Sequence, residues 1–250
     1  MNKKSIIITL LVLASAAFIV WRIIEGGKKK VGHAVVLRDR SDSTASDCDC
    51  TKDLAAFALK DINIEKGSTV TVTVTGDAET ANEPEKMLSF EVPVNRQVLE
   101  GQNAMAAKRD KLLQEVKSQC EKMRPTTVSP IFIAVKRAVQ HLQSLGCGTA
   151  SSPCALYVQS DLEDSVEKAI KALIDNPQSK QPLPAKIDNR GIRIIFFAIA
   201  ETVGEKKVDG KNRQLTKKHD PQRIDRIETV WRSLFTNPEL IIFKPHCLGE

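Results

Sequence analysis

Short, unbroken apolar runs alternate with helical patterns along most of the chain. Residues 33–37, 155–158, 192–200 and 240–243 are the apolar runs, and each is the length of a strand. Apolar residues recur at helical spacing in the segments between them. Strands that are apolar throughout are buried on both faces, which is typical of a parallel sheet covered by helices. The pattern predicts an α/β fold with a doubly wound, mostly parallel, six-stranded sheet and helices on both faces.

Other segments add strands and helix starts to this frame. Residues 68–75 alternate strictly between polar and apolar, and residues 88–92 form a short second strand in this region. Helices are expected from about residue 54 behind Thr51 as N-cap, over 103–120, from Pro130 as the first helical residue, from about Val166, and from Asp220-Pro221.

The first residues read as a membrane segment. Residues 5–21 carry no charge and are about long enough to cross a bilayer as a helix. A cleaved signal peptide is the alternative, with Lys3 and Lys4 before the apolar run and Ala14-Ser15-Ala16 as cleavage site. The apolar run continues past that site, which favours the anchor. We expect a single-pass membrane protein with a transmembrane helix over 1–24, a linker over 25–31 and one domain over 32–250.

Two signals disagree on the side of the membrane. Arg22 and the lysines at 28–30 outweigh the charges before the apolar run, which favours a cytoplasmic domain. Six cysteines favour disulfides in an oxidising compartment instead. They allow 15 pairings, of which only Cys147 with Cys154 is suggested by closeness in sequence. We expect an extracytoplasmic domain, with the side left open.

The composition indicates which classes of partner to expect. The chain carries a formal charge of +6, but aromatic residues make up only 4% of it. Base-stacking platforms need aromatic side chains, so no nucleic acid is expected. Many of the positive charges lie between residues 203 and 223, which we interpret as a basic loop that attracts an acidic ligand surface. A solvated loop is the alternative.

Oxygen-bearing side chains follow two of the predicted strands. Asp39, Ser41 and Ser43 come directly after the first strand, and Asp161 follows the strand at 155–158. The carboxyl ends of parallel strands meet at one edge of a sheet, where such folds place their ligands. Ser129 lies just before a helix. Each of these residues also has a local alternative as a turn former or helix cap.

These residues resemble the von Willebrand factor A family over about residues 32–245. The family's metal-ion-dependent adhesion site combines a D-x-S-x-S motif after the first strand, a Thr before a middle helix and an Asp after the fourth strand. The resemblance also implies a short antiparallel edge strand, here residues 88–92. Two departures are that a Ser stands where the family prefers Thr, and that Leu162 stands where Gly is usual. The implied metal residues are Asp39, Ser41, Ser43, Ser129 and Asp161, with Thr127 as fallback for Ser129.

The resemblance implies a protein-binding module rather than an enzyme. Mg²⁺, with Mn²⁺ or Ca²⁺ as alternatives, favours oxygen ligands of this kind, and an acidic residue of a partner protein would complete its coordination. One alternative is a Mg²⁺-dependent phosphohydrolase of the haloacid-dehalogenase type. That chemistry needs a second Asp two residues after the first, and Ser41 occupies the position. Another alternative is a scaffold of the same fold with an inactive metal site.

Overall fold

The computed structural model describes nine segments of the chain, which are residues 31–41, 47–61, 67–75, 85–91, 102–148, 153–199, 201–208, 211–218 and 221–247. The chain divides into a unit over Met1–Lys30 and a second unit over Val31–Glu250. The predicted anchor at 1–24, nearly all of the linker and Ser43 lie outside the described residues. Within the described segments, every helix is too short or too polar to span a bilayer.

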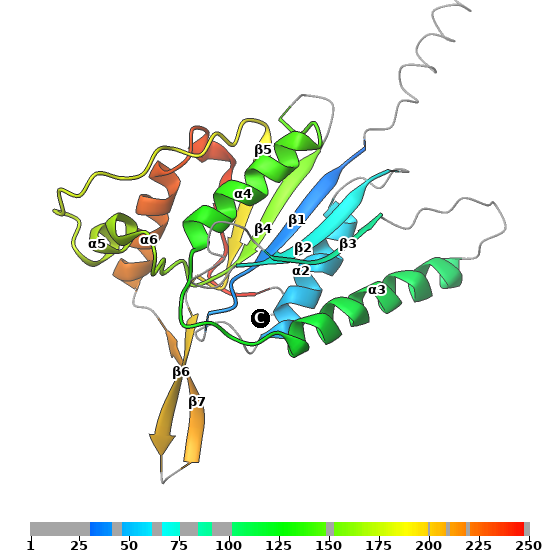
Figure 1. Cartoon of the computed structure of the whole chain (residues 1–250), viewed down its shortest axis with the longest axis horizontal. Coiled ribbons are helices and arrows are strands. Elements are labelled where there is room, and N and C mark those ends of the chain that lie inside the picture. Colours follow the sequence, from blue (N-terminus) through cyan, green and yellow to red (C-terminus); the bar gives the residue numbers. More distant parts are fainter. Residues whose placement is uncertain are drawn as a thin grey trace, which may run out of the picture. The chain divides into compact units, whose positions relative to one another are not determined.

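A six-stranded sheet forms the centre of the second unit (Figure 1). The strand order is β3-β2-β1-β4-β5-β8. Four neighbouring pairs are parallel, and β3 runs antiparallel to β2 at one edge. This confirms the mostly parallel sheet and its antiparallel edge strand. The strand bounds are β1 His33–Arg38, β2 Thr69–Val74, β3 Glu85–Glu91, β4 Cys154–Gln159, β5 Ile192–Phe197 and β8 Ile241–Phe243.

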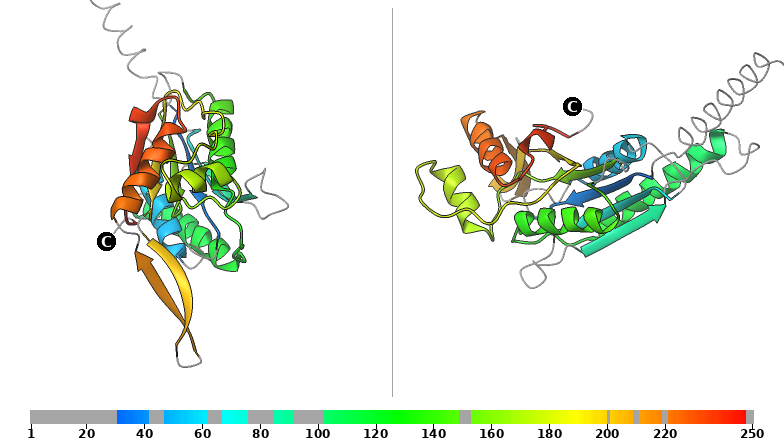
Figure 2. Two further views of the ribbon diagram at one scale, coloured as in Figure 1. Left: turned by 90° about the vertical axis from the view of Figure 1, so that its left-hand side faces the viewer. Right: turned by 90° about the horizontal axis from the view of Figure 1, so that it is seen from above.

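Helices cover both faces of the sheet (Figure 2). Successive strand residues point to opposite faces, so Val35 and Leu37 pack in one core and Val36 in the other. The first core contains residues of α4, α5 and α6, and the second contains residues of α2 and α3. The helix bounds are α2 Cys48–Asp61, α3 Gln102–Lys122, α4 Ile131–Ser144, α5 Lys168–Asp175, α6 Pro221–Ser233 and the 3₁₀ helix η1 Pro238–Leu240.

A buried tyrosine ties helix α2 to the sheet. Tyr157 of β4 donates a hydrogen bond from its hydroxyl to the carboxylate of Asp61, which also pairs with Arg193 of β5. Burial, helped by the bond to Asp61, raises the pKa of the Tyr157 hydroxyl above its ordinary value. The tyrosine therefore stays neutral and fixes the end of α2 over strands β4 and β5.

Three predicted helix starts are wrong. Helix α2 begins at Cys48, because Asp47 accepts the backbone N–H of Cys50; the hydroxyl of Thr51 instead donates to the Gln159 side chain at 2.7 Å. Helix α4 begins at Ile131, with Pro130 as its N-cap rather than its first helical residue. Helix α5 begins at Lys168, two residues after an exposed Val166.

The basic segment after β5 is a hairpin rather than a loop. Strand β5 ends at Phe197, three residues before its predicted end, and Ala198 takes a left-handed conformation with φ 64°. Strands β6 (Glu201–Val208) and β7 (Lys211–Lys218) then pair antiparallel as a two-stranded sheet of their own.

All six cysteines form disulfides. The bonds are Cys48–Cys120, Cys50–Cys247 and Cys147–Cys154. The pairing of Cys147 with Cys154, suggested by their closeness in sequence, is confirmed. The other two bonds join α2 to α3 and to the C-terminal segment, so α2 is fastened twice. Three disulfides are typical of proteins that fold in an oxidising compartment.

Candidate metal centre

The candidate residues lie where the strand order reverses. Strand β1 lies between β2 and β4, so the chain crosses in opposite directions on its two sides. Open α/β sheets place their ligands at such a point, outside the carboxyl ends of the strands. Asp39 follows β1 and Ser160 follows β4, and the Ser160 N–H donates to the Phe197 carbonyl at the end of β5. Three strand ends therefore meet at this edge.

Asp39 is the centre of the site and is fully buried. Its Oδ2 accepts the hydroxyl of Ser129 at 2.6 Å and the hydroxyl of Ser160 at 3.0 Å. Its Oδ1 accepts the backbone N–H of Ser41 at 3.0 Å and the hydroxyl of Thr75 at 3.3 Å. One carboxylate thus joins four segments that are far apart in the sequence.

Ser129 serves the site rather than capping its helix. Helix α4 has Pro130 as N-cap and no capping side-chain bond. Two hydrogen bonds hold the Ser129 backbone to Ser165. The Ser129 N–H donates to the Ser165 hydroxyl at 2.6 Å, and the Ser165 N–H donates to the Ser129 carbonyl at 3.0 Å. Thr127 is exposed, while Ser129 is buried and contacts Asp39. The structure thus brings Ser129, and not the fallback Thr127, to Asp39.

The turn after β4 carries Asp161 and a strained leucine. Asp161 is 3% exposed, and its Oδ1 accepts the N–H of Glu163 at 3.1 Å. Leu162 has φ 60°, a conformation that costs a residue with a Cβ about 1–2 kcal/mol. Its buried side chain packs in the core, and its carbonyl accepts the Trp231 indole N–H at 3.0 Å. A glycine would meet the backbone demand without strain, so core packing accounts for the leucine here.

Asp164 supports the same turn. It is 1% exposed and accepts the N–H groups of Phe132, Val166 and Glu167. Burial raises the pKa of Asp164, and the negative charge of Asp39 raises it further, against the opposing effect of these bonds. Asp164 therefore holds the first turn of α4 and the residues just before α5 together.

A buried arginine adjoins the site. Arg38, the last residue of β1, is 1% exposed. Burial lowers the pKa of its guanidinium, and the negative charges of Asp39 and Asp47 oppose that shift. The positive charge of Arg38 therefore offsets part of the negative charge beside it.

Sequence reasoning missed two residues of this cluster. Ser160 and Thr75 are both fully buried, and both donate hydroxyl bonds to Asp39. Each directly follows a strand, at Gln159 and Val74, which is the signal that could have found them. Ser41 is buried and lies in a bridge with Thr126.

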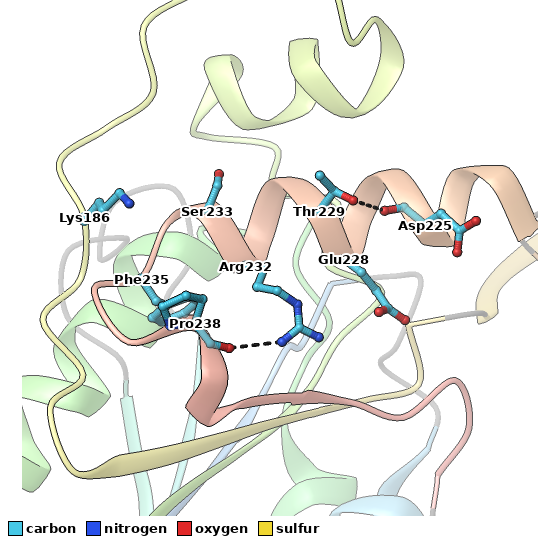
Figure 3. Close-up of a pocket in the computed structure, with 8 residues that line it drawn as sticks. All are labelled: Lys186, Asp225, Glu228, Thr229, Arg232, Ser233, Phe235 and Pro238. Atoms are coloured by element: carbon cyan, nitrogen blue, oxygen red, sulfur yellow. Dashed lines mark hydrogen bonds between the residues drawn. The ribbon is translucent and has the colours of Figure 1, made fainter.

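Two other places in the described residues resemble ligand sites, one a possible metal cluster and one a groove. In the described part of the chain, Asp47, Cys50 and Cys247 lie close enough together to hold a metal ion, but the two sulfurs are joined in a disulfide. A groove of about 470 Å³ lies along α6 (Figure 3). Its Arg232 donates to the carbonyls of Pro238 and Ile241. The candidate metal residues are absent from its lining, so the groove is separate from the site.

Comparisons with known proteins return structures only. No protein-family model matches the sequence, and no curated protein matches it. Similar solved structures include the conserved hypothetical protein BatB from Bacteroides thetaiotaomicron, at 10% identity and a TM-score of 0.42, over 86% of this chain and 90% of that one. An aerotolerance-related membrane protein from Bacteroides fragilis NCTC 9343, with multiple mutations to serines, has 10% identity and a TM-score of 0.39, over 87% and 92%.

A third similar structure is the ArnB paralog VWA2 from Sulfolobus acidocaldarius, at 12% identity and a TM-score of 0.34. The match covers 68% of this chain and 35% of that one. All three scores are too low to carry an argument about fold or function. The class of protein therefore rests on the chain's own topology and side chains: an open α/β sheet with an oxygen-rich cluster at its switch point.

Proposed function

We propose that this chain is a von Willebrand factor A-type module that binds a protein partner through a divalent cation. Ser41 and Ser129 would supply hydroxyl ligands, with Ser43 as a third hydroxyl from the same motif. Asp39 and Asp161 would balance the charge of the ion, largely through hydrogen bonds and water. Mg²⁺ is the expected ion, with Mn²⁺ or Ca²⁺ as alternatives. An acidic residue of the partner would complete the coordination.

One observation carries the proposal: the bonds from Ser129 and Ser160 to the same oxygen of Asp39. They bring the turn after β1, the start of α4 and the turn after β4 together at the switch point. A helix cap or a local turn requires only nearby residues, whereas Ser129 and Asp39 are separated by 90 positions. Local capping therefore does not account for this contact.

The donor chemistry fits a hard cation. The side chains gathered here offer hydroxyl and carboxylate oxygens, which Mg²⁺ prefers, with neither a thiolate nor an imidazole among the predicted ligands. Asp39, Asp161 and Asp164 are each at most 3% exposed, and buried negative charges are costly unless they are compensated. Arg38 supplies one positive charge nearby. A divalent cation would add to this compensation.

The arrangement favours binding over catalysis. Asp39 is 0% exposed and each of its oxygens already accepts two hydrogen bonds, which is unsuited to a nucleophile that must reach a substrate. Ser41 occupies the place of the acid/base Asp that a phosphohydrolase of the haloacid-dehalogenase type needs. We therefore propose no enzymatic activity.

We further propose that the domain is tethered by a transmembrane helix over residues 1–24 and faces an oxidising, extracytoplasmic compartment. The uncharged stretch at 5–21 supports the tether, and the three disulfides support the compartment.

Metal-dependent capture tests the proposal. The tagged full chain is incubated with extract from its own cells in Mg²⁺ or in EDTA, and the captured proteins are identified by mass spectrometry. A metal-completed site requires that a partner be retained in Mg²⁺ and lost in EDTA, and that Mn²⁺ restore it. A partner retained equally in EDTA would point to a scaffold with an inactive metal site.

A further inference from the structure

The β6–β7 hairpin divides its charges between its two faces. Residues opposite each other in an antiparallel pair share a face, and the faces alternate along the strands. The register pairs Lys206 with Arg213, Val208 with Lys211 and Thr202 with Lys217. All of these positions lie on one face. That face, which we call the basic face, carries four basic residues and no acidic one: Lys206, Lys211, Arg213 and Lys217.

The opposite face is balanced. It carries Lys207 and Lys218, and also Glu201 and Glu205. Neighbouring lysines in the sequence therefore fall on different faces, as at Lys206 and Lys207. A solvated hairpin has no need to sort its charges in this way, so the asymmetry points to a partner on the basic face.

Residues before and after the hairpin lie beside the candidate metal centre. Before the hairpin, the Phe197 carbonyl accepts the N–H of Ser160, the residue whose hydroxyl bonds Asp39. After it, Arg223 of α6 pairs with Glu163 at 2.5 Å, two residues beyond Asp161. Residues that flank the hairpin on both sides therefore contact the turn that follows β4.

We infer that the basic face docks an acidic protein surface surrounding the residue that reaches the metal. The inference rests on the proposed function, since it concerns the same partner. Charge complementarity identifies the partner's chemistry: clustered Asp and Glu side chains next to the acidic ligand residue.

A matched pair of double variants tests the face. K206E/K217E reverses two charges of the basic face, and K207E/K218E reverses their sequence neighbours on the other face. Both change the net charge of the full chain equally. The probe is a fluorescein-labelled synthetic peptide of alternating Glu and Ser, followed by fluorescence anisotropy at low salt in Mg²⁺. K206E/K217E should weaken peptide binding about tenfold and K207E/K218E less than about twofold, with the difference disappearing at high salt.

Equal weakening by both variants, or a wild-type chain that does not bind the peptide, would overturn the inference. The inference would also be overturned if K206E/K217E lost binding to phosphatidylserine vesicles, relative to phosphatidylcholine vesicles, and bound the peptide as the wild-type chain does. The basic face would then bind a lipid. Circular dichroism and thermal melting check that both variants fold. The proposed function fails separately: replacing Mg²⁺ by EDTA would then leave peptide binding by the wild-type chain unchanged, whatever the double variants do.

Discussion

Asp39→Asn is expected to weaken Mn²⁺ binding by about a hundredfold, the upper range for residues that orient metal ligands. The substitution removes one negative charge. It also replaces one carboxylate oxygen by an NH₂ group. In the wild-type chain, one of these oxygens accepts the hydroxyls of both Ser129 and Ser160. Binding is measured on the full chain by titration with Mn²⁺, followed by electron paramagnetic resonance of the free ion.

Two controls accompany this variant. Asp225→Asn, at an exposed position on α6, removes the same charge away from the site and should leave the affinity unchanged. Ser129→Ala should weaken binding, whereas Thr127→Ala, two residues earlier and exposed, should not. An unchanged Mn²⁺ affinity in Asp39→Asn would show that the Asp39 carboxylate does not contribute to metal binding. A loss in Thr127→Ala without one in Ser129→Ala would shift the hydroxyl ligand to the fallback residue.

Replacing Cys48 and Cys120 together by Ser is expected to lower the free energy of unfolding by about 4 kcal/mol. The disulfide closes a loop with a sequence separation of 72, and a cross-link that closes a longer loop removes more entropy from the unfolded chain. It also joins α2 to α3, whose only buried residues in the described part are Val116 and Cys120. Chemical denaturation of the full chain under non-reducing conditions measures the loss.

The short disulfide provides the matched comparison. Cys147 and Cys154 are separated by only 7 positions, so replacing both by Ser should cost about 2 kcal/mol on the same entropic basis. A larger loss from the short loop than from the long one would show that native-state contacts, rather than the length of the closed loop, set the contribution of these bonds.

The sheet could be predicted because its strands are buried on both faces. Val35, Val36 and Leu37 are each at most 1% exposed, and an apolar run of this length is typical of a parallel strand covered on both faces. Helix boundaries were harder to predict from the sequence. Asp47 and Thr51 are both good N-caps in sequence, and a contact between Thr51 and Gln159, 108 positions away, decides between them.

Within the candidate site, residues could be picked out from the sequence by their resemblance to a known motif, whereas the other hydrogen-bond partners of Asp39 could not. Ser160 and Thr75 are ordinary turn residues by sequence, and only the folded sheet brings their hydroxyls to Asp39. The hairpin had a readable signal. Asp209-Gly210 stands between its two strands, and Asp-Gly is a strong hairpin turn sequence. The two flanking strands could not be recognised, because their residues are mostly charged and polar and show no alternation of apolar and polar positions.

The central claim is that the turns bearing Asp39, Ser129 and Asp161 surround one divalent cation. Crystals of the full chain grown in Mn²⁺, with diffraction measured at the manganese absorption edge, test it directly. The account predicts a single anomalous peak within about 2.5 Å of the hydroxyl oxygens of Ser41 and Ser129. A peak elsewhere, or an edge of the sheet without one in crystals saturated with Mn²⁺, would contradict it and leave Asp39 as the centre of a structural hydrogen-bond network.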